Sequence, residues 1–138
     1  MADDLPLFAY GTLLTGARDP GIRRLVARAT RRLGPARVRG RLHDQGGYPG
    51  LVGTGSETGW VRGVLLELVG RGHALRLLDG YEGFDPSRPN AGEYVRVALP
   101  VERLPGYETV TAWTYLLNIR RVRPGPRIVG GDWRRVGK

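Results

Sequence analysis

One acidic side chain near the middle of the sequence has the setting of an acid or base catalyst. Glu82 lies in the segment LLDGYEGFDP, and on a helical wheel it falls on the arc that holds Leu75 and Leu78. We therefore expect its carboxylate to lean toward the core where this helix ends. Partial burial there would raise its pKa above the reference value of about 4.3, which produces a competent base near neutral pH.

Two features of the neighbouring sequence bear on this carboxylate. Asp79 and Asp85 lie close to Glu82 along the chain, and they would add like-charge repulsion if they faced it. The alternative is a helix that frays at Gly80 and leaves Glu82 exposed to solvent. In that case the carboxylate would have no perturbed pKa and no catalytic use.

A glycine turn after an apolar run is the second candidate for chemistry. LPLFAYGTLLTG predicts a short buried strand over residues 5–10, ended by Gly11. The glycine spacing imitates a phosphate loop, but Ala17 and Arg18 stand where Lys and Ser/Thr are required. A nest of backbone N–H groups, permitted by a positive φ at Gly11 and flanked by the Thr12 hydroxyl, would suit a small carboxylate. A plain strand-ending turn is the alternative.

Other catalytic chemistries fit the sequence poorly. There is no cysteine, which removes thiolate nucleophiles, disulfides and cysteine-ligated metals. Ser56 and Ser87 lack the G-x-S-x-G context of a nucleophilic serine, and no acidic or histidine pair has HExxH spacing. We expect His43 and His73 at surface or strand positions, and we expect no metal and no cofactor.

The elements that must position these groups indicate an α+β fold. The hydrophobic pattern predicts strands over 5–10, 36–43, 48–52, 60–68, 93–101 and 109–117, and helices over 20–33 and 73–81. Gly34 and Pro35 are expected to end the first helix. We expect a small mixed, mostly antiparallel β-barrel with a few short helices, because closure hides strand edges. One domain over 1–138 is predicted, with a core of about 5–118 and a tail over 119–138.

The strong positive charge is a weak guide to binding partners. The formal net charge is +9, but only Lys138 among the 22 basic residues is a lysine, which is typical of a GC-rich coding sequence. An arginine-rich nucleic-acid protein is the rival, although no nucleic-acid motif accompanies the arginines. No apolar run of about 18 residues or more and no secretory signal are visible. We therefore expect a cytoplasmic protein with no membrane partner and no specific nucleic-acid partner.

Five short motifs occur in an order that resembles a known family. They are YGTL at 10–13, LDGYEG at 78–83, EYVR at 93–96, WTYL at 113–116 and GDW at 131–133. In this order the chain is similar to the gamma-glutamylcyclotransferase-like family, specifically its branch of gamma-glutamylamine cyclotransferases and plant avirulence-induced proteins. The resemblance covers about residues 5–133. It implies a small mixed barrel with the YGTL loop at one mouth and a glutamate, Glu82, facing that loop.

The family resemblance also implies a reaction. The α-amine of a gamma-glutamyl amide would attack its own γ-carbonyl, which forms 5-oxoproline and releases an amine, with Glu82 as the general acid and base. The turn at Gly11 would hold the substrate α-carboxylate or the developing oxyanion, and both assignments stay open. The residues expected to bind substrate are Tyr10, Gly11, Thr12, Leu13, Tyr94, Arg96 and Tyr115.

Several of these assignments have alternatives. Arg96 pairs either with a substrate carboxylate or with Glu93 on the sheet surface, and Tyr115 is either a pocket residue or an ordinary core tyrosine. Trp133 is expected to plug the barrel end. In this family substrate choice depends on the rim, here DQGGYPG and FDPSRPNAG. We expect a monomer or homodimer, and a binding module that captures a gamma-glutamyl ligand without turnover is the alternative function.

Overall fold

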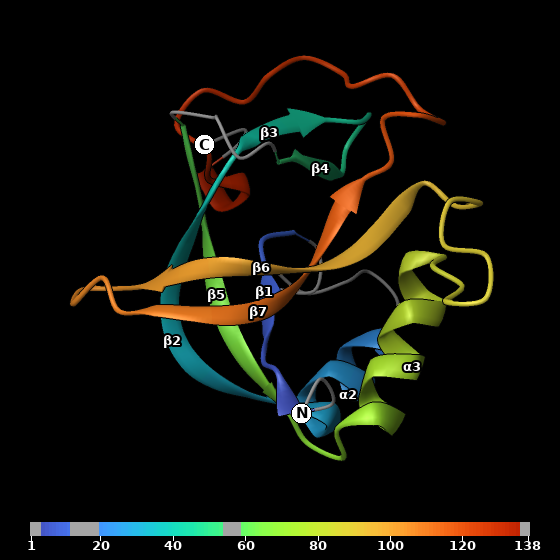
Figure 1. Ribbon diagram of the computed structural model, residues 1–138, viewed down its shortest axis with the longest axis vertical. Helices are drawn as coiled ribbons and strands as arrows, with labels where there is room; N and C mark the ends of the chain where they lie inside the picture. The colour runs from blue at the N-terminus through green and yellow to red at the C-terminus, as the bar shows by residue number, and fades with distance from the viewer. Residues whose placement is uncertain (1–3, 12–19, 54–58, 136–138) are drawn as a thin grey trace.

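The computed structural model describes residues 4–11, 20–53 and 59–135 and shows strands wrapped into a barrel, with two α-helices at one end (Figure 1). The strands are β1 (Leu7–Ala9), β2 (Thr30–Arg39), β3 (Arg41–Asp44), β4 (Pro49–Val52), β5 (Trp60–Leu68), β6 (Tyr94–Arg103) and β7 (Thr109–Leu117). The helices are α2 (Pro20–Ala29), α3 (Gly72–Glu82) and the 3-10 turn η2 (Trp133–Arg135).

The predicted mixed barrel is present. Its strands follow the order β1-β5-β2-β6-β7 and close through a parallel contact between β1 and β7, where Leu7 lies opposite Trp113. The other neighbours in the barrel pair antiparallel. The expected α+β class and mostly antiparallel barrel are therefore correct. Closure removes the free edges that would otherwise invite pairing with another chain.

The first helix is shorter than the sequence predicted. It was expected to reach residue 33, but α2 ends at Ala29 and β2 begins at Thr30. The next residues pair with β5, with Thr30 opposite Leu68. The expected stop at Gly34 is instead an irregularity inside β2, where the register shifts between Arg32 and Gly34. Long-range strand pairing thus overrides local helical periodicity, which is only a weak preference.

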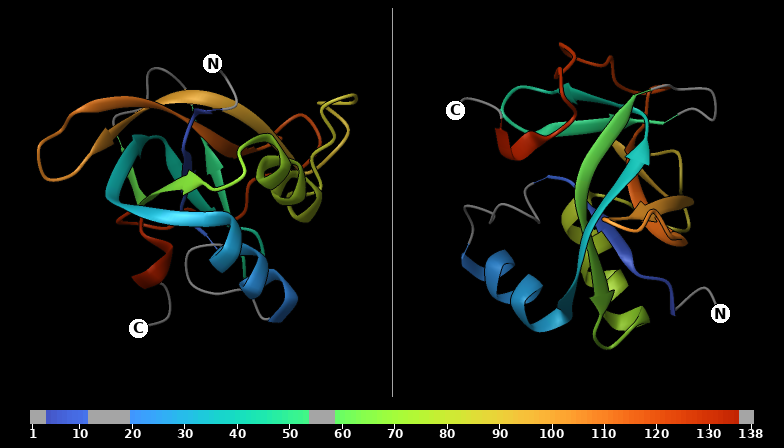
Figure 2. Two further views of the ribbon diagram at one scale, coloured as in Figure 1. Left: turned by 90° about the horizontal axis from the view of Figure 1, so that it is seen from below. Right: turned by 90° about the vertical axis from the view of Figure 1, so that its left-hand side faces the viewer.

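The predicted strand over 36–43 is divided between two sheets. β2 ends at Arg39 and β3 begins at Arg41, so the chain leaves the barrel at Gly40 and forms a separate two-stranded sheet with β4. In the right panel of Figure 2 this sheet lies at the end of the molecule opposite α2 and α3. The small sheet therefore covers one end of the barrel, and α2 and α3 cover the other.

The described part of the predicted C-terminal tail, residues 119–135, packs against the rest of the protein. The N–H of Ile128 donates to the carbonyl of Leu42 at 2.7 Å, and the N–H of Arg62 donates to that of Gly131 at 2.8 Å. Ile128 and Trp133 both pack against buried barrel residues. The position of Trp133 agrees with the expectation that it covers a barrel end.

Alternation along β1 and β5 builds two hydrophobic clusters. Leu7 and Leu66 pack in the cluster that includes Leu78 of α3, whereas Phe8 and Leu65 pack in the other. Successive strand side chains point to opposite faces, so a strand buried on both faces joins the two clusters. No helix in the described part of the chain is long and apolar enough to span a bilayer.

Candidate active site

A pocket opens where the end of β1 meets β4, β6, β7 and the last turn of α3. Its cavity volume is about 50 Å³, which is well below the range of about 300–1,000 Å³ that is usual for small-molecule sites. The residues that line it are Phe8, Ala9, Tyr10, Gly11, Tyr48, Pro49, Glu82, Tyr94 and Tyr115. The fold thus brings together five of the predicted site residues: Tyr10, Gly11, Glu82, Tyr94 and Tyr115.

The opening turn differs from its sequence-based interpretation. Thr12 and Leu13 lie outside the described residues, so their predicted contacts stay predictions. Gly11 does not adopt the positive φ that was expected. A Cβ at this position would instead lie 2.7 Å from Cγ of Pro49. Glycine is therefore required here because β4 passes close to the turn.

The end of α3 determines the position of Glu82. The helix continues through Glu82 and does not fray at Gly80. Gly83 then adopts a left-handed φ of 71°, its N–H donates to the carbonyl of Gly80 at 3.3 Å, and the N–H of Phe84 donates to that of Asp79 at 2.9 Å. This pair of bonds is a Schellman motif, which ends a helix at a defined residue. Glu82 is therefore held at the pocket wall and is not exposed on a frayed end.

The environment of Glu82 suits proton transfer near neutral pH. Burial raises the pKa of its carboxyl to about 7, and the negative charge of Glu93 adds to the rise. The expected like-charge contribution of Asp79 and Asp85 is not the cause. Asp79 is bound to Arg96, and exposed Asp85 accepts hydrogen bonds from the backbone and hydroxyl of Ser87.

Arg96 pairs with Asp79 and not with Glu93, the protein partner that the sequence suggested, and its contact with a substrate carboxylate stays a prediction. It is outside the pocket lining, and its guanidinium grips Asp79 through Nε–Oδ1 at 2.8 Å and Nη2–Oδ2 at 3.2 Å. The hydroxyl of Tyr115 donates to the same Asp79 Oδ1 at 2.7 Å. Asp79 is 3% exposed, so a buried ion pair ties β6 and β7 to α3 one turn before Glu82. Arg96 and Asp79 therefore position the helix end, a role that sequence reasoning missed for Asp79.

The tyrosines of the pocket wall are buried hydrogen-bond donors. Tyr10 donates to the carbonyl of Tyr115 and accepts from the N–H of Leu51 at 3.2 Å, while Tyr94 donates to the carbonyl of Pro49. Burial raises the pKa of Tyr10, Tyr94 and Tyr115, and the charge of Glu82 raises each further. The three phenols therefore remain neutral near neutral pH. Among the described lining residues, Glu82 provides the carboxyl group that can change its protonation there. Tyr115 lines the pocket and is also a core residue.

Four residues of the pocket lining were not singled out as site residues from the sequence: Phe8, Ala9, Tyr48 and Pro49. Tyr48 and Pro49 come from the rim segment DQGGYPG, and the hydroxyl of Tyr48 donates to Oε2 of Glu93 at 2.6 Å. The other predicted rim segment contributes none of the described lining residues. A proline and a tyrosine in a glycine-rich loop give no chemical signal, so only the return of β4 to the barrel identifies them.

Comparison with known proteins identifies the family. Residues 7–135 match the family described as Gamma-glutamyl cyclotransferase, AIG2-like. The chain belongs to this family. The resemblance inferred from the five motifs is thereby confirmed, and the family supports gamma-glutamyl cyclotransferase-type activity at a general level. A search of curated proteins found no match.

Several solved structures share the fold of this chain. The crystal structure of YkqA from Bacillus subtilis is 24% identical, with a TM-score of 0.68, and the match covers 94% of this chain but only 39% of YkqA. An AIG2-like protein from Mus musculus is 23% identical, with a TM-score of 0.63 and coverage of 82% and 76%. A protein from Arabidopsis thaliana, determined in solution, is 26% identical, with a TM-score of 0.61 and coverage of 86% and 65%.

Histidine and metal-ligating residues do not gather in the described part of the chain. No group of three or more His, Asp or Glu side chains with the arrangement of a metal site occurs there. His43 is buried in β3, where its Nδ1 lies 2.7 Å from the carbonyl of Gly125. It therefore joins the C-terminal segment to the small sheet, which agrees with the strand position expected for it.

The raised pKa of Glu82 predicts a pH-dependent cost in stability. Because the folded pKa is about 7 and the ordinary value is 4.5, the folded state binds the proton more tightly, and stability falls as pH rises from about 4.5 to 7. Glu82→Gln removes this loss. We expect urea unfolding to show that the stability of the variant relative to wild type is greater at pH 8 than at pH 4 by about 3 kcal/mol. Glu108→Gln, at an exposed site, is the control. If the stability difference between Glu82→Gln and wild type were the same at pH 4 and pH 8, the prediction would be contradicted.

Proposed function

We propose that this protein is a gamma-glutamyl cyclotransferase that converts a gamma-glutamyl amide into 5-oxoproline and a free amine. The observation that carries the proposal is the position of Glu82, on the wall of a small pocket with a pKa raised to about 7. Membership of the family supports the reaction class. Because the chain spans 39% of YkqA, the activity of that whole protein is not transferred to it.

The proposed reaction needs one proton carrier and no water. The carboxylate of Glu82 removes a proton from the substrate α-ammonium, and the freed amine attacks the γ-carbonyl carbon. A C–N bond closes the five-membered ring while the original amide C–N bond breaks. Glu82 then returns the proton to the departing amine, and the ring nitrogen gives up its second proton, which the released amine takes up as it becomes an ammonium ion. A pKa near 7 suits both transfers, because the same group must accept and donate at one pH.

The remaining pocket residues would hold the substrate in a folded shape. The nucleophile belongs to the substrate, so the protein must bring the α-amine to the γ-carbonyl, and positioning of this kind supplies much of the rate. The aromatic rings of Tyr10, Tyr94 and Tyr115 would confine the glutamyl chain. Gly11 lines the pocket, and in this proposal its backbone, together with Thr12 and Leu13 as predicted from the sequence, would bind the substrate α-carboxylate or the oxyanion.

A substrate panel tests the proposed function directly. Purified protein incubated with gamma-glutamyl amines, gamma-glutamyl dipeptides and gamma-glutamyl-lysine isopeptides is expected to release 5-oxoproline from at least one class, measured by mass spectrometry. Saturable binding without release across the whole panel would favour the non-catalytic binding module. Salt-dependent binding of RNA at about 0.15 M salt, without binding of any panel member, would favour the arginine-rich nucleic-acid protein.

A further inference from the structure

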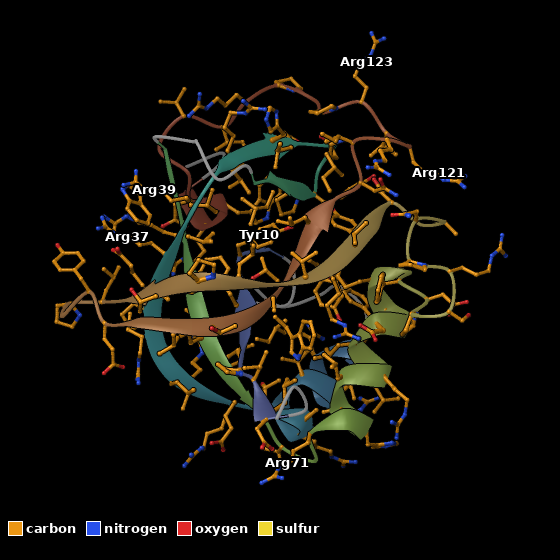
Figure 3. The ribbon with its side chains drawn as sticks, in the orientation of Figure 1. Tyr10, Arg37, Arg39, Arg71, Arg121 and Arg123 are labelled. Carbon is orange, nitrogen blue, oxygen red and sulfur yellow. The ribbon has the colours of Figure 1, made fainter. Side chains whose placement is uncertain are left out.

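The pocket lacks positive charge on a strongly basic protein. Although the chain carries 22 Lys and Arg residues and a formal net charge of +9, none of the described residues that line the pocket is basic. Figure 3 shows the labelled arginines, such as Arg37 and Arg123, at the outline of the molecule, with Tyr10 in its middle. The guanidinium of Arg96 is already bound to Asp79. The described pocket is therefore locally acidic.

A second carboxylate, that of Glu93, is held beside the pocket. Its backbone carbonyl accepts the N–H of Asn118 at 2.7 Å, and the amide side chain of buried Asn118 donates to the carbonyls of Asn90 and Gly92. The hydroxyl of Tyr48 donates to Oε2 of Glu93 at 2.6 Å. Both ends of Glu93 are thus anchored.

The anchored carboxylate is bound to Tyr48, the most solvent-exposed tyrosine of the described pocket lining. Tyr48 lines the pocket and is 37% exposed, whereas Tyr10 is 6% exposed. The charge of Glu93 also raises the pKa of both Glu82 and Tyr94, which indicates that its carboxylate lies near these two wall residues. A group leaving the reaction centre toward solvent would therefore pass this carboxylate.

We propose that Glu93, oriented by Tyr48, is a specificity-determining residue that binds a positively charged nitrogen on the leaving amine. The inference rests on the proposed function and adds the class of substrate: gamma-glutamyl amides whose amine carries a second, protonated nitrogen. Because the Glu93 carboxylate accepts a hydrogen bond from the Tyr48 hydroxyl through one oxygen, its other lone pairs can accept hydrogen bonds from an ammonium group. A cation placed there also relieves the repulsion between Glu93 and Glu82, which a neutral or anionic leaving group does not do.

Three substrates of similar length isolate the charge of the leaving group. They are the gamma-glutamyl monoamide of 1,4-diaminobutane, which is cationic, the n-pentylamide, which is neutral, and the amide of 4-aminobutanoate, which is anionic. We expect wild-type kcat/KM to favour the cationic over the neutral amide by about fivefold at low salt, since ion pairs near a protein surface are modest. The preference should shrink as ionic strength rises.

Substitution of Glu93 separates substrate binding from an effect on Glu82. In Glu93→Gln the cationic-to-neutral ratio should fall to about one, and Tyr48→Phe should lower it partly. A change in the basicity of Glu82 alone would alter all three substrates equally and leave the ratio intact, which would overturn the inference. Glu67→Gln is the matched control, because Glu67 is an exposed glutamate outside the pocket that pairs with Arg31.

Binding to a non-reacting variant distinguishes failure of this inference from failure of the proposed function. Calorimetry with Glu82→Gln should show the same order of affinity, with the cationic amide bound most tightly, and addition of Glu93→Gln should abolish that order. If wild type turns over none of the three compounds, the proposed reaction is contradicted. If the neutral amide is used or bound as well as the cationic one, the role of Glu93 is contradicted.

Discussion

Glu82→Gln is expected to lower kcat for 5-oxoproline release by roughly 10²- to 10⁴-fold, the usual contribution of a general acid or base. Glutamine keeps the size and polarity of the side chain but neither accepts nor releases the proton at neutral pH. The fold should persist, because the helix end is held by Gly83 and Phe84 through backbone bonds that do not involve this side chain. Turnover by mass spectrometry and thermal unfolding by circular dichroism measure the two effects.

A neighbouring carboxylate supplies the control for this substitution. Asp85 is exposed and caps its own turn through Ser87, so Asp85→Asn should leave kcat within about twofold of wild type. The wild-type rate should also rise with pH through about 7, because the carboxylate form of Glu82 begins the reaction. Wild-type turnover by Glu82→Gln on a substrate that the protein demonstrably cyclises would remove Glu82 from the mechanism.

Arg96→Met is expected to destabilise the protein by about 3–5 kcal/mol, which is large relative to a typical stability of about 5–15 kcal/mol. The substitution keeps the apolar stem but leaves the carboxylate of Asp79, with a side chain only 4% exposed, without its ionic partner. The hydroxyl of Tyr115 alone does not replace a bidentate guanidinium. Urea unfolding, with a check that the denaturant dependence is unchanged, measures this loss.

Two further variants test whether the loss arises from burial of the ion pair. Asp79→Asn combined with Arg96→Met should recover part of the stability, since no uncompensated charge stays buried. The exposed pair between Arg31 and Glu67 is the comparison, and Arg31→Met should cost less than about 1 kcal/mol. Equal losses for Arg96→Met and Arg31→Met would show that the pair at Asp79 contributes no more than a surface contact.

Much of the fold was predictable, because apolar residues repeat clearly at strand spacing or at helix spacing in most segments. Five of the six predicted strands and both helices lie where apolar alternation or helical spacing indicated, with shifted ends. The region around residues 30–41 was not predicted correctly. There, the arginines fit the polar face of a helix that Gly34 was expected to end, whereas pairing with β5 makes Thr30–Arg39 a strand. Strand pairing between distant segments is decided by tertiary contacts, so a local pattern does not reveal it.

The candidate site was partly predictable, because helical spacing also indicates which face of a helix is buried. Helical spacing from Leu75 and Leu78 correctly placed Glu82 on the buried side, although its chemical role remains our proposal. The protein partner suggested for Arg96, Glu93, was wrong, because an arginine on a strand has several carboxylates close to it along the sequence. Its pairing with Asp79 depends on how β6 packs against α3.

The sequence by itself determined the strand and helix periods, the absence of cysteine chemistry, the buried direction of Glu82 and, through five ordered motifs, the family. Only the tertiary structure decided what surrounds that carboxylate: the tyrosine wall, the ion pair behind it and the like charge of Glu93 beside it. The physical reason is that a pKa depends on burial and on charges within a few ångströms. In a closed barrel those neighbours come from strands that are far apart along the chain.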